Sequence, residues 1–307
     1  MQQKFSFFIN KVTLLVKVFR HKKFMMKIRV GVVGCGSIGS EICKAIDGDG
    51  ASGLDLGMEL KFLIDSNQAN IDRLCKSLTK TPNILKSDNT ELDKGLDTVD
   101  LVIECASQAA VREFIIPALK KGKEVMILSV GALLCELGLF EEIERIAKEK
   151  GCKVHIPSGA VAGIDGLKSA AIGGIQTVEL TTKKPPSGFE GNNYVKGQGI
   201  DLTSIKKAET LFMGHAKEAV KYFPENLNVA ASLSIAGIGS EATKVKIVAD
   251  PSAKKNVHEI MVTGKFGNFF VCVENVPSIA NPKTSYLAAL SAIATLKSIS
   301  YPIRVGT

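Results

Sequence analysis

A glycine pattern near the start of the chain, GCGSIG, is typical of a loop that binds a dinucleotide. It directly follows the apolar run KIRVGVV, which predicts a buried parallel strand, and it opens a helical segment. In this setting Gly34 permits a tight turn, Gly36 lets a pyrophosphate approach the backbone, and Gly39 lets helix and strand pack closely. Ser37 and Ile38 add N–H groups at the helix N-terminus, where phosphate binds. A glycine turn without a nucleotide is the competing interpretation.

Asp65 ends the second predicted strand, LKFLI, and lies twenty-six residues after Gly39. This spacing is slightly longer than the usual one of about 20 residues because of a glycine-rich insertion, DGDGASGLDLG. A carboxylate at this position accepts the ribose hydroxyls of NAD and repels the 2′-phosphate of NADP. Ser66 and Asn67 follow without a nearby Arg, so the sequence favours NAD and leaves NADP open. The alternative is an exposed Asp in a turn.

Four histidines are candidates for proton transfer, and their settings differ. His258 lies where a loop rich in Asp, Pro and Lys meets a predicted hairpin, so its side chain can reach a cleft while its backbone is held. An imidazole that titrates near neutrality suits proton transfer beside a hydride step, which makes His258 the preferred catalytic residue. His215 is the second candidate. His155, in an apolar strand, is interpreted as a packed or hydrogen-bonded core residue, and His21 lies in a basic N-terminal extension.

Two further segments carry groups at positions where a cofactor or substrate would bind. Ala160 belongs to PSGA, after the fifth predicted strand at the carboxyl edge of the sheet. Asn228 belongs to FPENLN, where it either caps the following helix or contacts the nicotinamide carboxamide or the substrate. Candidate carboxylate binders, with ordinary surface lysines as the alternative, are Lys183, Lys184 and Lys283. The sequence contains no zinc-ligand spacing, Ser-His-Asp order or phosphate-binding GK[ST] motif, so we expect no metal.

The elements that position these residues follow a strict strand–helix alternation up to about residue 165. Such alternation predicts an α/β fold with a Rossmann-type, doubly wound parallel sheet. The predicted strands are 27–33, 60–64, 101–105, 125–130 and 153–160, and the predicted helices are 41–46, 67–78, 108–122 and 137–151.

The pattern then changes to longer β-rich segments, which predict a second, α+β domain on an antiparallel or mixed sheet. Its predicted strands include 178–186, 243–251 and a hairpin over 257–276 that turns near 265–268, and its predicted helices are 205–223 and 228–238. A last helix within 281–299, with Thr284 as N-cap, is expected to return to the first domain. The predicted division is an extension (1–25), a dinucleotide-binding domain (26–165) joined by the C-terminal helix (283–307), and a substrate domain (166–282).

The net charge of +8 is concentrated at the N-terminus, because residues 1–25 hold six basic residues and no acid. The remainder is nearly neutral, Trp is absent and aromatic residues are only 6%, so nucleic-acid binding is not expected. The extension is too short for a membrane span and lacks a cleavage site. We interpret it as a misassigned start, with translation from Met25 or Met26; a basic surface helix is the alternative. The seven scattered cysteines indicate a reduced, cytoplasmic protein.

Four later motifs, together with the glycine loop, resemble those of the archaeal-type L-aspartate dehydrogenase family. They are IPSGAVAGIDG, FPENLNVAASLSIAG, ADPSAKKNVHEIMVTGKFG and NPKTSYLAALSAIATL, and they run in the family's order over about residues 26–307. The resemblance implies oxidation of L-aspartate by NAD or NADP to iminoaspartate, which hydrolyses to oxaloacetate and ammonia or feeds NAD biosynthesis. It also implies a homodimer whose α+β domain serves catalysis and dimerisation. The first twenty-five residues have no counterpart in the family pattern.

The resemblance assigns roles to three residues of this chain. His258 falls on the family's N-x-H-E-like motif, which carries the active-site histidine, while Ala160 and Asn228 match its NAD-contacting alanine and asparagine. The alternatives are a dihydrodipicolinate-reductase-like or homoserine-dehydrogenase-like enzyme, or a protein that senses NAD without turnover. The first of these would be expected to show an adjacent His-His pair, and no such pair exists here.

Overall fold

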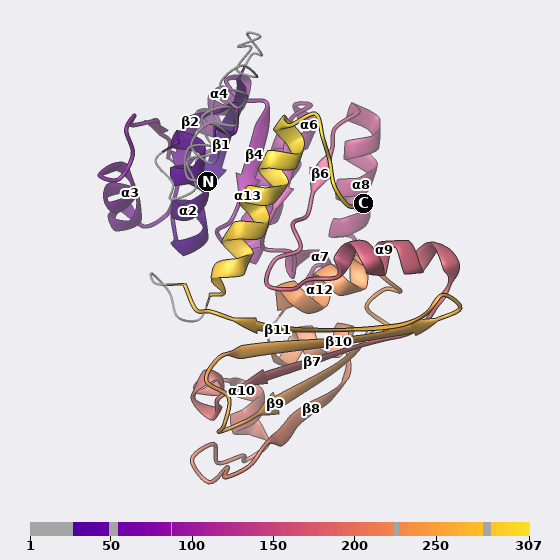
Figure 1. Cartoon of the computed structure of the whole chain (residues 1–307). Helices are drawn as coiled ribbons and strands as arrows, with labels where there is room; N and C mark the ends of the chain where they lie inside the picture. Colours follow the sequence, from indigo (N-terminus) through magenta and orange to yellow (C-terminus); the bar gives the residue numbers. More distant parts are fainter. Residues whose placement is uncertain (1–26, 49–54, 87, 224–226, 279–283) are drawn as a thin grey trace, which may run out of the picture.

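The structure, a computed structural model, describes residues 27–48, 55–86, 88–223, 227–278 and 284–307. Extension 1–25 and Lys283 therefore lie outside the described residues. Within these ranges the chain builds two sheets, each with its own helices, and Figure 1 shows them one above the other.

The first sheet has six strands, all parallel, which confirms the predicted doubly wound α/β fold. In spatial order the strands are β3 (Asn83–Ile84), β2 (Met58–Ile64), β1 (Ile28–Val33), β4 (Leu101–Glu104), β5 (Glu124–Ile127) and β6 (Val154–His155). The order reverses beside β1, and the carboxyl ends of β1 and β4 at such a reversal form the crevice where nucleotides bind in this fold. The fifth predicted strand is short here, because the chain leaves the sheet after His155.

Helices cover both faces of this sheet. They are α2 (Ser37–Asp47), α3 (Gln68–Cys75), α4 (Asn89–Asp97), α5 (Gln108–Ala110), the π-helical segment η1 (Val111–Ile115), α6 (Ile116–Lys120), α7 (Ala132–Cys135) and α8 (Leu139–Lys150). One core joins Val32 and Ile42 to side chains of α3, and the other joins Phe62 and Ile115 to side chains of α8. The sequence interpretation missed β3 and α4, which are short and lie near the edge of the sheet.

The second sheet has five strands in the order β11-β10-β7-β9-β8 and is mixed, because β7 and β9 are parallel while the other pairs are antiparallel. The strands are β7 (Ile175–Lys184), β8 (Glu209–His215), β9 (Lys244–Ala249), β10 (Asn256–Gly264) and β11 (Gly267–Asn275). The predicted hairpin is present, since β10 and β11 pair from Asn256↔Asn275 to Gly264↔Gly267.

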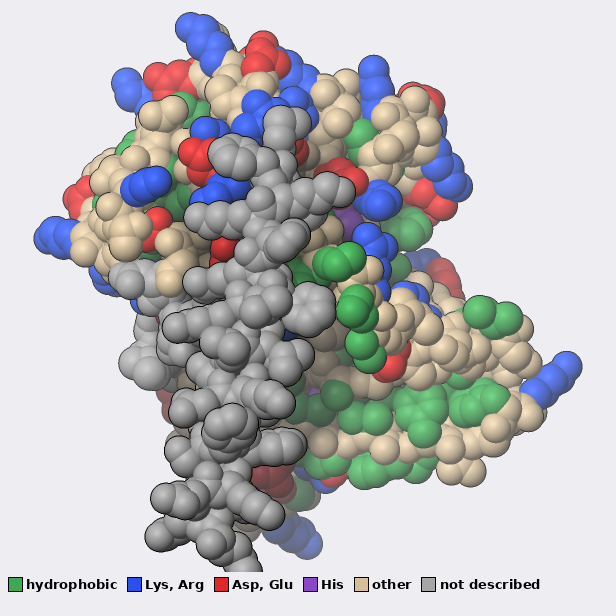
Figure 2. Space-filling model, turned by 45° about the horizontal axis from the view of Figure 1, so that its top comes forward, with side chains coloured by type: hydrophobic (Ala, Val, Ile, Leu, Met, Phe, Trp, Pro, Cys, Tyr) green, Lys and Arg blue, Asp and Glu red, His purple; other side chains and the backbone are tan. Residues whose placement is uncertain are grey.

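One face of the second sheet is covered and the other is open. The covering elements are α9 (Ile164–Gly173), η2 (Pro186–Phe189), α10 (Asn193–Gly197), α11 (Ala216–Tyr222) and α12 (Leu227–Ala236). On the open face, Met261 and Phe270 remain 38% and 56% exposed. Figure 2 shows hydrophobic side chains gathered at the surface of this lobe.

The predicted helix over 205–223 is wrong in its first half. Glu209–His215 form β8, an edge strand that pairs with β9, and only Ala216–Tyr222 (α11) is helical. Leu211 and Phe212 are both buried, and the register with β9 shifts between Thr210 and Phe212. Adjacent buried residues fit a helical face as well as a bulged strand, so strand pairing decides the conformation.

The last helix, α13 (Tyr286–Ser300), leaves the second sheet and packs against α2 of the first (Figure 1). Its buried residues Ala292 and Leu296 belong to the same core as Val30 and Ile42. Ser285, rather than the predicted Thr284, occupies the N-cap position. This return of the chain places Thr284, Ser285 and Ala288 between the two sheets.

Candidate active site

The glycine loop joins β1 to α2 as predicted, and each glycine has a different structural reason. Gly34 adopts φ +100°, a left-handed conformation, and a Cβ atom there would lie 2.7 Å from the backbone of Cys105. At Gly39 a Cβ would lie 1.9 Å from the Gly34 carbonyl oxygen, because helix and loop are in close contact. Both positions therefore require glycine for the fold itself.

Gly36 is different, because nothing in the described protein requires a glycine there. Its backbone angles, φ −69° and ψ −159°, are accessible to any residue, and a Cβ would meet no atom within 4 Å. It is the N-cap of α2 and has no side chain to cap the first N–H groups. The open space over a positive helix N-terminus fits the phosphates of a dinucleotide.

Asp65 follows β2 and is tied to the glycine loop. Its Oδ2 accepts the Cys35 N–H at 2.6 Å and its Oδ1 accepts the Asn67 N–H at 2.7 Å. The carboxylate lines a pocket of about 340 Å³ together with Gly34 and Gly36. The pocket lies at the carboxyl ends of the strands, so a ribose ring bound there would meet the carboxylate while the phosphates meet the loop.

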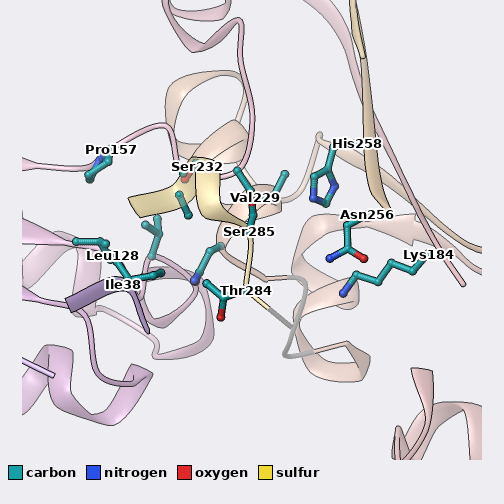
Figure 3. A pocket seen from close by; sticks show the side chains of 15 residues that line it. Ile38, Leu128, Pro157, Lys184, Val229, Ser232, Asn256, His258, Thr284 and Ser285 are labelled. Atoms are coloured by element: carbon teal, nitrogen blue, oxygen red, sulfur yellow. The ribbon is translucent and has the colours of Figure 1, made fainter. Parts of the chain in front are cut away.

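A second pocket, of about 200 Å³, lies between the two sheets and contains most of the other predicted residues. Those that line it are Ile38, Ala160, Asn228 and His258. In Figure 3, Ile38, Leu128 and Pro157 of the first domain lie on one side, and the polar side chains of the second sheet face them. Residues as far apart in the chain as Ile38 and Ala288 therefore meet around one cavity.

His258 lies on β10 directly opposite Thr182 of β7, and its ring points into this cavity (Figure 3). The side chain is 5% exposed, and Nδ1 is hydrogen-bonded to the Thr182 hydroxyl at 3.0 Å. Burial, reinforced by the positive charge of Lys184, lowers the pKa of His258 to about 4. The ring is therefore neutral at physiological pH.

The other described histidines lie elsewhere. His155 Nε2 contacts Glu124 at 2.9 Å, which agrees with the interpretation of a hydrogen-bonded residue. His215 ends β8 and is exposed at the N-terminus of α11, where its N–H donates to Glu218. Neither residue lines the pocket of His258.

Lys184 and Asn256 add a positive charge and an amide beside His258. Lys184, at the end of β7, is only 7% exposed and lines the cavity, as does Asn256 at the start of β10 (Figure 3). Lys183 points to the opposite face and pairs with Glu259 at 2.5 Å. The two adjacent lysines could not be distinguished by residue type; strand alternation distinguishes them. Asn256 was missed, although it lies two residues from His258 and so on the same face of β10.

Asn228 and Ala160 are held in place by contacts that cross the domains. Asn228 lies in the first turn of α12, so the N-cap interpretation is wrong, and its Oδ1 accepts the Gly131 N–H at 2.9 Å. The Ala160 carbonyl accepts Asn275 Nδ2 at 2.9 Å. Ser37, expected to meet phosphate, has its hydroxyl hydrogen-bonded to Ser278 at 2.5 Å, which leaves its backbone N–H for a ligand.

Buried Glu104, the last residue of β4, was not singled out by the sequence. Its carboxyl group is fully buried and accepts four hydrogen bonds, from the N–H groups of Ala106, Ser107 and Ser129 and from the Ser129 hydroxyl. Burial raises the pKa of Glu104, and the four donors oppose the increase. An acidic residue at the end of a buried strand is the signal that could have drawn attention to it.

Comparison with known proteins agrees with this geometry. Residues 165–299 match the family model described as aspartate dehydrogenase, C-terminal, and residues 34–157 match the NAD-binding domain of homoserine dehydrogenase. The chain is 54% identical to an L-aspartate dehydrogenase of Methanosarcina acetivorans over 282 residues, which cover 91% of this chain and 100% of the relative. The chain belongs to the L-aspartate dehydrogenase family.

Solved structures of this family and its neighbours share the fold. A crystal structure of aspartate dehydrogenase from Thermotoga maritima matches with a TM-score of 0.67 and 27% identity, over 91% of this chain and 99% of that one. A homoserine dehydrogenase from Thiobacillus denitrificans matches with a TM-score of 0.58 but 14% identity, over 89% and 73% of the two chains, and shows the fold alone.

None of the helices in the described ranges has the length and apolar character that a membrane crossing requires.

Proposed function

We propose that this protein oxidises L-aspartate at its α-amine with NAD or NADP. The product is iminoaspartate, which hydrolyses to oxaloacetate and ammonia or is consumed in NAD biosynthesis. The observation that carries the proposal is the cavity between the sheets, where His258, Lys184 and Asn256 face the first domain's nucleotide edge. A bound nicotinamide would supply the acceptor for the hydride removed from Cα of the substrate.

The cationic and amide groups suit a substrate that carries a carboxylate. The Lys184 ammonium binds a substrate carboxylate, and the Asn256 amide donates a further hydrogen bond to it. Because Lys184 is nearly buried, its charge is weakly screened and attracts a carboxylate more strongly than a surface lysine does.

His258 accepts the proton that the α-ammonium group must lose before the imine forms. Its neutral ring is a proton acceptor at physiological pH, and Thr182 fixes the orientation through Nδ1. The negative carboxylates of the substrate oppose the effect of Lys184 and raise the pKa of His258 when the site is filled. This change makes the imidazole a better base at the moment when a base is needed.

The remaining predicted residues hold the cofactor. Gly34, Gly36 and Gly39 shape the loop for the pyrophosphate, and the N–H groups of Ser37 and Ile38 bind it. Asp65 accepts the adenosine ribose hydroxyls and favours NAD over NADP. The Asn228 oxygen accepts the Gly131 N–H, so its Nδ2 would be the group that holds the nicotinamide carboxamide in the cavity that Ala160 also lines.

The decisive experiment follows absorbance at 340 nm with purified protein, L-aspartate and either NAD⁺ or NADP⁺. We expect reduction with both cofactors, faster with NAD⁺, and oxidation of NADH in the reverse direction with oxaloacetate and ammonium. D-Aspartate, L-asparagine and L-glutamate serve as substrate controls, and His258→Ala as the protein control. Nucleotide binding without any aspartate-dependent change would instead identify a sensor, and turnover of a different amino acid a different dehydrogenase.

We also propose a homodimer in the cytoplasm. The open face of the second sheet, with exposed Met261 and Phe270, supports self-association through the catalytic domain. All seven cysteines are described and free, which supports a reducing compartment. Light scattering on the purified protein tests the dimer, and a mass of one chain would contradict it.

A further inference from the structure

The buried carboxylate of Glu104 connects two loops, each of which borders one of the two pockets described above. One loop, residues 105–107, follows β4, and the other, residues 128–131, follows β5. Oε1 accepts the N–H groups of Ala106 at 2.8 Å and Ser107 at 3.1 Å and the Ser129 hydroxyl at 2.8 Å. Oε2 accepts the Ser129 N–H at 3.1 Å.

Each of the two loops lines a different pocket. Ala106 and Ser107 line the pocket that contains Asp65 and the glycine loop. Leu128 and Val130 line the pocket that contains His258, so Ser129 lies between two residues of that lining. Gly131, the next residue but one, donates its N–H to Asn228 in the same pocket. A displacement of Ser129 would therefore reach the nicotinamide side of the groove and leave the adenosine side in place.

The four hydrogen bonds require a carboxylate at position 104, because each of the four partner groups of Glu104 donates a hydrogen. Glutamine has a single oxygen, which can keep the three bonds made by Oε1. Its amide nitrogen would then face the Ser129 N–H, so two donors would meet in a buried position where neither finds an acceptor. Aspartate is shorter by one methylene, so it can reach the adjacent loop after β4 but not the loop across the strands.

We propose that Glu104 is a positioning residue that fixes the nicotinamide-side loop relative to the adenosine-side loop through its bonds to Ser129. The inference rests on the proposed nucleotide-dependent function. Glu104 contacts neither pocket directly: it acts through Ser129 and Gly131 on the residues that line them.

The test compares two ligands on the full-length protein. ADP fills only the adenosine and phosphate part of the groove, whereas NADH extends to the nicotinamide side. For Glu104→Gln we expect the dissociation constant of NADH to rise about tenfold while that of ADP stays within about twofold. Glu104→Asp should likewise raise the dissociation constant of NADH and leave that of ADP within about twofold. Glu124→Gln, which removes a carboxylate from a β5 residue that lines neither pocket, should change neither constant.

Thermal denaturation of each variant checks that it is folded under the binding conditions, and Glu104→Asp carries the test if Glu104→Gln does not fold. Ser129→Ala removes only the hydroxyl bond and keeps the backbone bond to Oε2, so it should bind both ligands within about twofold of the parent protein. The inference is overturned if NADH and ADP weaken by the same factor, or if neither weakens. Failure of the proposed function is seen separately, because the parent protein would then bind no NADH or show no aspartate-dependent reduction.

Discussion

Gly36 offers the sharpest test of the nucleotide site, because the protein alone gives no reason for a glycine there. Gly36→Ala places a methyl group where no atom lies within 4 Å and where φ is −69°. Two small effects on stability oppose each other: alanine restricts the unfolded chain, but it is a poorer N-cap than glycine. We expect the free energy of unfolding to change by less than about 1 kcal/mol.

The effect on nucleotide binding should be much larger. The added methyl group occupies the space through which the phosphates approach the N–H groups at the start of α2. Loss of one hydrogen bond to a charged group costs about 1.5–3 kcal/mol. The dissociation constant of NADH should therefore rise about 10- to 150-fold, and Gly36→Val should raise it further.

Fluorescence titration with NADH and thermal denaturation, applied to three matched variants, separate binding from folding. Gly39→Ala puts a Cβ 1.9 Å from the Gly34 oxygen, so it should destabilise the protein by about 1–3 kcal/mol or more. Gly34→Ala should also destabilise it, because its φ is +100°. Gly36→Ala alone should keep the stability of the parent protein and bind NADH more weakly. Unchanged NADH affinity in that variant would refute the assignment of the loop to the cofactor.

Three further predictions concern the cavity between the sheets. His258→Ala should lower kcat by about 10²–10⁴-fold with nearly unchanged NADH affinity; steady-state kinetics and titration check this, and parent-like turnover would refute the role. Because the folded-state pKa of His258 lies at about 4, below its ordinary 6.5, its neutral form stabilises the protein above pH 6.5 and this stabilisation is lost as the pH falls to 4. Urea unfolding should show a loss of about 3 kcal/mol over this range that is absent in His258→Gln; equal pH profiles would contradict the burial argument. Lys184→Met should raise KM for L-aspartate about tenfold or more and move the acid limb of the kcat/KM profile to higher pH, because the charge that lowers the pKa of His258 is gone. An unchanged KM would exclude Lys184 from substrate binding.

Much of the first domain could be predicted because its signals are local. The strand at Ile28–Val33, the glycine loop and α2 are adjacent in the chain, and their apolar runs and glycines have few other uses. The segment 205–223 was harder, since its apolar spacing fits both a helix and a strand. Pairing of β8 with β9, from Glu209↔Ala249 to His215↔Lys244, decided the conformation of this segment.

The candidate site was predicted only where one residue type pointed to one chemistry. His258 was chosen from four histidines for its place between loop and hairpin, and the structure gives it a cavity and a hydrogen bond to Thr182. Asn256 and Glu104 carried no such signal, because an asparagine beside a loop and an acid at a strand end have many ordinary uses. Their importance depends on what lies opposite them in space.

The sequence by itself determined the nucleotide edge of this protein: a strand, a glycine turn and a helix N-terminus form from about twenty consecutive residues, so their geometry follows from local backbone preferences. Only the tertiary structure decided the chemistry of the cavity. The register of β10 against β7 places His258 opposite Thr182, and strand alternation turns Lys184 inward and Lys183 outward. A shift of one residue in that pairing would reverse which side chains face the cavity, and that register is set by packing across the whole sheet.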